Sequence, residues 1–354
     1  MKFRLCAPTR TRMLSGALVL AAIAATAAAA GPSSASYTVA ARWQLGGDGG
    51  WDYLTIDPGA RRLFVTRGDH VDVLDLETGH PVGTIANTAG VHGVALARDR
   101  NRGYTSNGRA NTVTVFALDT LEVIATVPVA GINPDAILYE PRYGHVFTFN
   151  GRSSDASVFD AASLKPVARI ALPGKPEFSV TDTDGTVFVN IEQEQGQIVA
   201  IDGKTLGVRA TWRLPDCADP SGLAFDQAHH RLFSVCDHGV MVVTDSISGR
   251  QVAQVAIGKG PDAAAFDAKS GLVFSSNGED GTLTVVHQDD ADHYRPVATV
   301  ATQATARTMA LDLATGRVYL AAANLVAATE PPPPGRPRRQ VAPGSFVILV
   351  AQPD

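Results

Sequence analysis

Cysteine is scarce in this chain, with 3 among 354 residues, and the cysteine-based motifs are absent. There is no Cys-x-x-Cys-His sequence, which excludes covalently attached haem. A phosphate-binding Gly loop, a Gly-x-Ser-x-Gly elbow and a His-Glu-x-x-His zinc motif are missing too. The sequence therefore offers no obvious candidate for nucleophilic catalysis.

Strong helical periodicity is also missing, except near the N-terminus. There, an apolar, Ala-rich stretch over residues 13–30 follows four basic residues: Lys2, Arg4, Arg10 and Arg12. This pattern predicts a Sec-type signal peptide over residues 1–30, and hence a periplasmic or secreted protein. A membrane anchor is the alternative, but eighteen weakly hydrophobic residues are barely long enough to span. Cleavage near Ala30 would leave no stable membrane span.

Positive charge is in short supply once this leader is removed. Residues 31–354 carry 26 Lys and Arg against 35 Asp and Glu, a formal charge of −9. A nucleic-acid backbone requires clustered cations, so this balance disfavours nucleic acid as a partner.

A short aromatic-centred phrase recurs seven times. The aromatic residues are 40, 43, 41, 45, 41 and 45 positions apart; they are Phe64, Tyr104, Phe147, Phe188, Phe233, Phe274 and Tyr319. A period near 40 built from short apolar strands is typical of a β-propeller. Because one repeat cannot bury its own apolar face, the repeats must pack on one another. We therefore predict an all-β, seven-bladed β-propeller of four-stranded blades, forming one domain over residues 37–354.

The last repeat lacks its fourth strand. It supplies candidate strands over 308–313, 317–322 and 346–350 and then stops, whereas residues 37–45 form an unpaired strand before the first full repeat begins at Trp51. Placing this N-terminal strand on the outside of blade seven closes the ring and removes a free sheet edge. The arrangement favours seven blades over six or eight.

The repeat combines Gly-x-x-Pro-Asp, an apolar strand, an aromatic-Val-Thr-Asn-Gly phrase and Thr-Val-x-Val before an Asp. It resembles the YVTN-type propeller repeat, and residues 37–354 as a whole resemble the exported YncE-like seven-bladed propellers. The resemblance implies the fold, with WD40-like architecture, but brings no family-wide catalytic set. Related folds include scaffolds, lactonases and quinoprotein subunits, so the function stays open.

Two cysteines remain after the leader, Cys217 and Cys236. In an exported protein such a pair suggests a disulfide. The repeat places Cys217 in the loop before blade five and Cys236 at the end of the second strand of that blade, within bridging reach. Two unpaired thiols are the alternative.

The four strands of each blade are lettered a to d in the order in which they are counted outward from the axis. The start of strand a should border the propeller axis on one face, here called the top face, where the d–a and b–c loops gather. In blade order this ring reads Asp52, Gly93, Asp135, Glu177, Ser221, Asp262 and Arg307, and the preceding position reads Trp51, His92, Pro134, Pro176, Pro220, Pro261 and Ala306. Pro and several acids follow the repeat consensus. The breaks at Trp51, His92 and Arg307 are where a ligand could have selected the residue, although Trp51 could instead wedge between blades.

The candidate axial site therefore comprises Trp51, Asp52, His92, Asp135, Glu177, Asp262 and Arg307. The b–c loops add the candidates Arg67, His70, Arg109, Arg152, Glu192 and His238, with Asp237 and Glu279 nearby. No cofactor is predicted, but the axial carboxylates could hold a divalent cation such as calcium. The alternative is a hydrated acidic funnel with counter-ions.

One insertion enlarges the b–c connection of blade seven. It covers residues 329–344 and includes Pro331–Pro334 and three arginines, Arg336, Arg338 and Arg339. Such a segment is extended and locally basic. It could dock a partner, lie over the axial funnel, or be a solvated loop.

These observations favour an exported, monomeric binding or scaffold protein that recognises an envelope protein or a small molecule on its top face. The alternative is a lactonase-like hydrolase. In that case the axial carboxylates, with or without a metal, would activate water, and His92 or Arg307 would stabilise the oxyanion. Nucleic-acid binding through the arginine-bearing loops is a third possibility.

Overall fold

The computed structural model describes residues 1–4, 7, 36–327 and 339–354. Residues Ser34–Asp354 form one compact unit. The predicted signal peptide falls largely outside the described residues. Within the described part, no helix has both the length and the apolar character needed to cross a membrane.

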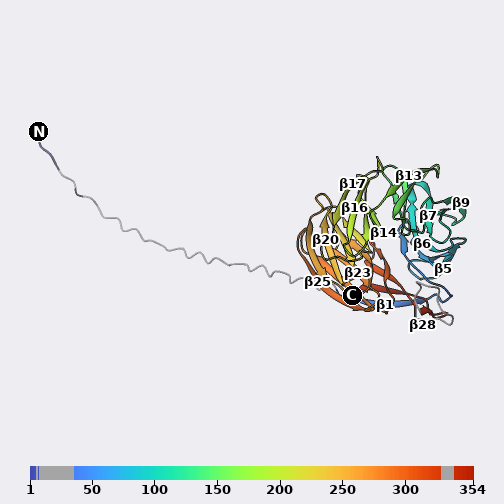
Figure 1. The fold of residues 1–354 in the computed structure, drawn as a ribbon. Coiled ribbons are helices and arrows are strands. Elements are labelled where there is room, and N and C mark those ends of the chain that lie inside the picture. Colours follow the sequence, from blue (N-terminus) through green and yellow to red (C-terminus); the bar gives the residue numbers. More distant parts are fainter. Residues whose placement is uncertain (5–6, 8–35, 328–338) are drawn as a thin grey trace. The chain divides into compact units, whose positions relative to one another are not determined.

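Seven four-stranded antiparallel sheets follow one another around an axis, as Figure 1 shows. Counted outward from the axis, the strands of each blade are a, b, c and d. Strands a are β2 (Leu54–Asp57), β6 (Val91–Ala97), β10 (Pro134–Glu140), β14 (Lys175–Thr181), β18 (Leu223–Asp226), β22 (Pro261–Asp267) and β26 (Thr308–Asp312). Strands b are β3 (Arg62–Thr66), β7 (Arg102–Asn107), β11 (His145–Asn150), β15 (Thr186–Glu192), β19 (Arg231–Cys236), β23 (Leu272–Asn277) and β27 (Arg317–Ala322).

The outer half of each blade completes the pattern. Strands c are β4 (Val71–Asp75), β8 (Thr112–Ala117), β12 (Asp155–Asp160), β16 (Gln197–Asp202), β20 (Val240–Asp245), β24 (Thr282–Gln288) and β30 (Val347–Pro353). Strands d are β5 (Pro81–Ile85), β9 (Val123–Pro128), β13 (Pro166–Ala171), β17 (Val208–Arg213), β21 (Gln251–Ala256), β25 (Tyr294–Ala301) and β1 (Tyr37–Gln44). A short 3-10 turn, η1 (Arg98–Arg100), interrupts blade two. The predicted all-β, seven-bladed fold is confirmed.

The core lies between neighbouring blades. All seven repeated aromatic residues fall on strands b and are at most 2% exposed. Phe64 of blade one packs on Phe116 of blade two, with ring centroids 5.8 Å apart, and Phe233 of blade five packs on Phe266 of blade six at 5.4 Å. The recurrent phrase therefore marks the residue that fills the wedge between blades.

The ring closes as the sequence predicted. Strand β1 pairs antiparallel with β30, so the last blade has the order β26-β27-β30-β1. Strand β2 of blade one also contacts β26 of blade seven. In Figure 1 the blue β1 lies beside the red C-terminal strand.

Recurrent Asp and Asn residues close turns and connections. Asp75 Oδ1 accepts hydrogen bonds from the backbone N and the hydroxyl of Thr78, at 2.8 and 2.7 Å. Asn107 at the end of β7 donates to Thr112 and Thr114 of β8. Because these side chains are satisfied within their own blade, the repeat explains them without a ligand.

Candidate functional site

The mouth of the propeller axis forms a cavity of about 680 Å³, here called the axial cavity. Seven of the predicted binding residues line it: Trp51, Asp52, Asp135, Glu177, Glu192, Asp262 and Arg307. His92 lies against Asp52 and Asp135. All but Glu192 come from the chain entering strand a or from its start, which is why residues far apart in the sequence meet here.

A chain of opposite charges links five blades around this cavity. Arg307 Nη1 lies 2.5 Å from Asp262 Oδ2, and Arg307 Nη2 lies 3.8 Å from Asp52 Oδ1. His92 Nδ1 lies 2.6 Å from Asp52 Oδ2 and 3.6 Å from Asp135 Oδ1. His92 and Arg307, two of the three residues that break the repeat consensus, therefore supply the positive charges of this chain.

A second charged cluster occupies blade four. Lys175 Nζ lies 2.5 Å from Glu177 Oε1 and also contacts Glu192. The hydroxyl of Tyr53 donates to Glu177 Oε2 at 3.4 Å, which connects this cluster to blade one. Because Tyr53 is buried and packs on Phe178 with ring centroids 5.4 Å apart, it forms the floor of the cavity beside Glu177.

The cavity perturbs the acidity of its side chains. Burial disfavours the charged form of His92, but the hydrogen bond to Asp52 and the charge of Asp135 outweigh it and raise the pKa of His92 to about 9. Burial also raises the pKa of Asp135 above its ordinary range, against the opposing charge of His92. These effects follow from placing charged groups in an enclosed, partly desolvated space.

Glu177 gives a testable pH dependence. Burial, the neighbouring Glu192 and the charge of Asp135 raise the pKa of Glu177, against the opposing effect of Lys175. Between the ordinary pKa of a glutamate and the raised pKa of Glu177, the folded protein keeps a proton that the unfolded chain has already lost. The stability of the fold therefore decreases as the pH rises from the lower of these two values to the higher. We expect a lower unfolding temperature at about pH 8 than at about pH 5, and a flatter dependence for Glu177→Gln, measured by thermal unfolding.

Glu122 provides the matched control for this experiment. It is exposed on the turn between strands c and d of blade two, which are the strands farthest from the axis. Glu122→Gln should keep the pH dependence of the unmodified protein. A Glu177→Gln variant with an unchanged dependence would show that this carboxyl does not titrate as proposed.

Trp51 both lines the axial cavity and packs between blades. Its ring lies 5.4 Å from that of Phe346, which precedes β30 of blade seven. The indole Nε1 is buried and has no hydrogen-bond partner among the described residues. Trp51 therefore has one side toward the cavity, where a ligand could contact it, and also packs as a wedge between blades.

Five predicted b–c loop residues do not line the axial cavity. Arg67 is 3% exposed, donates to the Gly46 carbonyl at 2.9 Å and covers the Phe346 ring at 3.9 Å. His70 pairs with Asp69 at 2.7 Å, and His238 lines a separate cavity near Cys217. The remaining two, Arg109 and Arg152, are exposed. The arginines thus do not form one continuous basic face.

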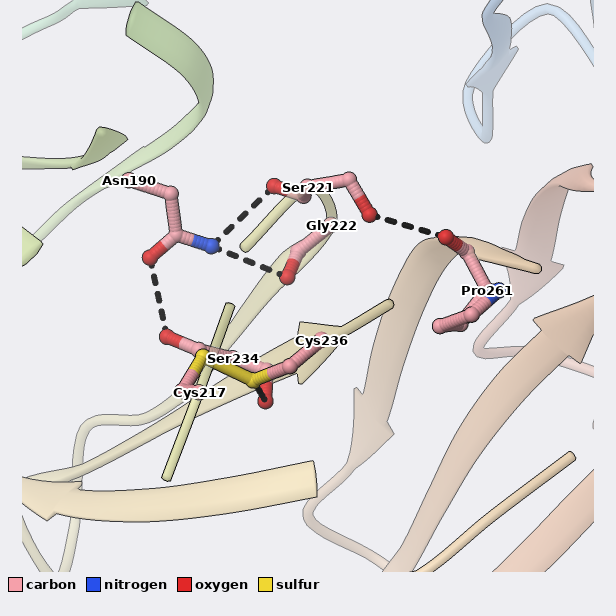
Figure 2. Close-up of a disulfide and its surroundings, with 7 residues drawn as sticks. All are labelled: Asn190, Cys217, Ser221, Gly222, Ser234, Cys236 and Pro261. Atoms are coloured by element: carbon pink, nitrogen blue, oxygen red, sulfur yellow. Dashed lines mark hydrogen bonds between the residues drawn. A yellow bond between two sulfur atoms is a disulfide. The ribbon is translucent and has the colours of Figure 1, made fainter. Parts of the chain in front are cut away.

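Cys217 and Cys236 form a disulfide, with Cα atoms 5.3 Å apart (Figure 2). It fixes the loop that leads into blade five, whose strand a begins only at Leu223. Figure 2 shows the Asn190 amide donating to the carbonyls of Ser221 and Gly222, at 3.0 and 3.1 Å. The Ser221 hydroxyl donates to the Pro261 carbonyl at 2.9 Å. The disulfide therefore supports a segment that lines the axial cavity.

Two short strands form a hairpin at the base of the insertion of blade seven. Strands β28 (Leu325–Ala327) and β29 (Arg339–Val341) pair antiparallel, and Leu325 and Arg339 line the axial cavity. The residues between them, 328–338, lie outside the described residues, so the extended, polyproline-like conformation stays a prediction.

Among the lining residues that sequence reasoning missed, three carry polar or charged side chains that bear on the site: Tyr53, Lys175 and Asp219. A signal for two of them existed two positions before the predicted ring, where the chain reads Gly50, Val91, Asn133, Lys175, Asp219, Gly260 and Thr305. Five members of this set line the cavity: Gly50, Lys175, Asp219, Gly260 and Thr305. Tyr53 carried no signal, because its inward position depends on how β2 sits in the ring.

Comparison with known proteins identifies the fold. No protein-family model matches the chain, and no curated protein is similar to it in sequence. Among solved structures, a chain of Kuenenia stuttgartiensis hydrazine synthase is 16% identical with a TM-score of 0.70, covering 77% of this chain and 92% of that one. U3-55K and the RRP9 WD40 repeats are each 9% identical with TM-scores of 0.73; both cover 89% of this chain, and 99% and 98% of their own. At such low identity the likeness shows architecture alone: this chain is a seven-bladed, WD40-like β-propeller.

Proposed function

We propose that this chain is an exported, YncE-like binding protein that holds a small, positively charged molecule in its axial cavity. The observation that carries the proposal is the charge of the lining. Eight acidic side chains, of which Glu177 keeps its proton, face three basic residues: Asp52, Asp135, Glu177, Glu192, Asp219, Asp237, Asp262 and Glu279, against Lys175, Arg307 and Arg339. A cavity of one sign with low-dielectric walls concentrates ligands of the opposite sign.

The uncompensated part of this charge lies over blades five and six. Asp219, Asp237 and Glu279 form no salt bridge with any residue that the structure describes. Burial raises the pKa of Asp237, and the nearby negative charges of Asp219 and Glu279 raise it further because they disfavour its ionised form. A bound cation would relieve this repulsion, and the rings of Trp51 and Tyr53 add aromatic surface that favours organic cations.

A polyamine provides a direct test. We expect spermidine to bind, as measured by calorimetry, with an affinity that falls as salt is added, whereas sorbitol and succinate should not bind. Asp219→Asn with Asp237→Asn should weaken spermidine binding roughly tenfold or more. A control pair, Glu122→Gln with Asp184→Asn, removes the same charge from exposed positions outside the cavity and should bind as the unmodified protein does. Equal binding by both double variants would rule out the cavity as the site.

A lactonase-like hydrolase is the second candidate, favoured by the environment of Asp135. A buried carboxyl with a raised pKa, near two cationic side chains, is suited to act as a general base. This function predicts that Asp135→Ala or Glu177→Ala abolishes lactone hydrolysis. Turnover of a lactone panel by the unmodified protein and by these variants separates an enzyme from a binding protein.

The proposal places the protein outside the cytoplasm as a monomer, and an envelope protein bound on the top face is the alternative partner. Support for export comes from the basic and apolar N-terminal sequence and from the disulfide. The membership in YVTN-type propellers rests on the repeated phrase. The acidic cavity and the burial of Arg67 speak against a nucleic-acid ligand on this face.

A further inference from the structure

Three metal-ligating side chains from blades one, two and three converge beside the axial cavity. A donor atom of each of Asp52, His92 and Asp135 lies within 4.8 Å of the others. Among the residues that the structure describes, this is the one group of three or more His, Cys, Asp or Glu side chains with such geometry. Their sequence separations of about 40 residues exclude a local turn as the reason for their meeting.

Asp135 is the most weakly paired carboxylate of this group. Its side chain is 13% exposed, and its carboxylate accepts no hydrogen bond from the described part of the chain. Its nearest positive group, His92 Nδ1, is 3.6 Å away. A carboxylate buried to this degree normally has a close partner, because desolvation without one is costly. Since Asp135 lines the axial cavity, an ion there could reach it.

The surroundings fix the backbone at Asp52 and Asp135 and enclose the His92 ring. His92 Nε2 and the Asn133 side chain, which interact with each other, both lie against Gly108, where an added Cβ would clash with His92 Nε2 and Asn133 Oδ1. The backbone N of Asp52 donates to Thr66 Oγ1 at 3.0 Å, and the Ser106 hydroxyl donates to the Asp135 carbonyl. Orientation of a ligating His through its other ring nitrogen is typical of metal centres.

We propose that Asp52, His92 and Asp135 bind one divalent first-row transition-metal ion, such as Zn²⁺ or Co²⁺. One imidazole nitrogen with two carboxylates suits these ions, whereas calcium prefers an all-oxygen shell. Three protein ligands leave coordination positions open toward the axial cavity, as in catalytic zinc sites. The site lies on blades one to three, whereas the uncompensated carboxylates of the proposed ligand site lie on blades five and six, so either site can exist without the other.

The test uses the purified protein without a polyhistidine tag, treated with chelator and then desalted. We expect one Co²⁺ or Zn²⁺ per chain after gel filtration, measured by elemental mass spectrometry, and visible Co²⁺ absorption bands of mixed nitrogen and oxygen coordination. His92→Asn and Asp135→Asn should each weaken binding at least tenfold, and Asn133→Ala roughly tenfold. Calcium should not displace Co²⁺.

His293 provides the matched control. It is exposed and pairs with Asp290 at 2.9 Å, but has no third ligand in that geometry. His293→Asn should bind Co²⁺ as the unmodified protein does. Retention of Co²⁺ by a folded His92→Asn variant, binding of calcium in place of Co²⁺, or no stoichiometric ion in the unmodified protein would each overturn the proposal. Spermidine binding by the metal-free protein is measured separately, so failure of one site is distinguished from failure of the other.

Discussion

A chain without residues 37–44 is expected to form a propeller that is less stable as a whole. These residues form β1, whose pairing with β30 completes blade seven. Tyr37 packs on Phe274 of blade six, and Trp43 packs on Tyr319, each with ring centroids 5.3 Å apart. Losing both aromatic contacts costs on the order of 5 kcal/mol or more. We expect the unfolding temperature to drop by roughly 7 °C or more, measured by differential scanning calorimetry.

The truncation also exposes the edge of β30. Unpaired strand edges promote association between chains, so the variant should aggregate at concentrations where the full chain does not. Removing residues 2–33 instead, which lie outside the compact unit, is the control and should leave the unfolding temperature unchanged. A synthetic peptide covering residues 36–45, added in trans, should restore part of the lost stability. An unchanged unfolding temperature after loss of β1 would contradict closure of the ring by this strand.

Removal of the disulfide is expected to have the second largest effect. Cys217 and Cys236 are 19 positions apart, and both are buried. Opening a loop of this length costs about 3 kcal/mol in the chain-entropy description. A Cys217→Ala/Cys236→Ala variant should therefore unfold roughly 4 °C below the unmodified protein. Thermal unfolding with and without reductant checks this.

The same variant should affect the axial cavity, because the disulfide holds the segment carrying Asp219 and Ser221. We expect spermidine to bind more weakly to the double variant, even at temperatures where it stays folded. Reductant supplies the control, since it should lower the stability of the unmodified protein to that of the variant and leave the variant itself unaffected. A variant that binds spermidine normally would show that the loop keeps its conformation without the cross-link.

Prediction of the site from sequence depended on the repeat. Aligning the strand a starts placed Asp52, Asp135, Glu177, Asp262 and Arg307 in one group, and the structure brings these five to one cavity. The same alignment did not indicate which side chains of the b–c loops point toward the cavity and which point elsewhere. Arg67 has the same sequence signature as an exposed loop arginine, but it is buried over Phe346. Its direction depends on the approach of blade seven, which no local pattern encodes.

The sequence by itself determined the number of blades, the position of the buried aromatic on each strand b and the closing role of residues 37–45. These features are periodic, and a period in the chain becomes a rotation about one axis. Only the tertiary structure decided which side chains meet across that axis. The pairing of His92 with Asp52 and Asp135, and of Arg307 with Asp52 and Asp262, depends on how closely neighbouring blades approach. That distance is set by packing of the whole ring. The charge pairs and the proposed metal ligands could therefore be identified only from the tertiary structure.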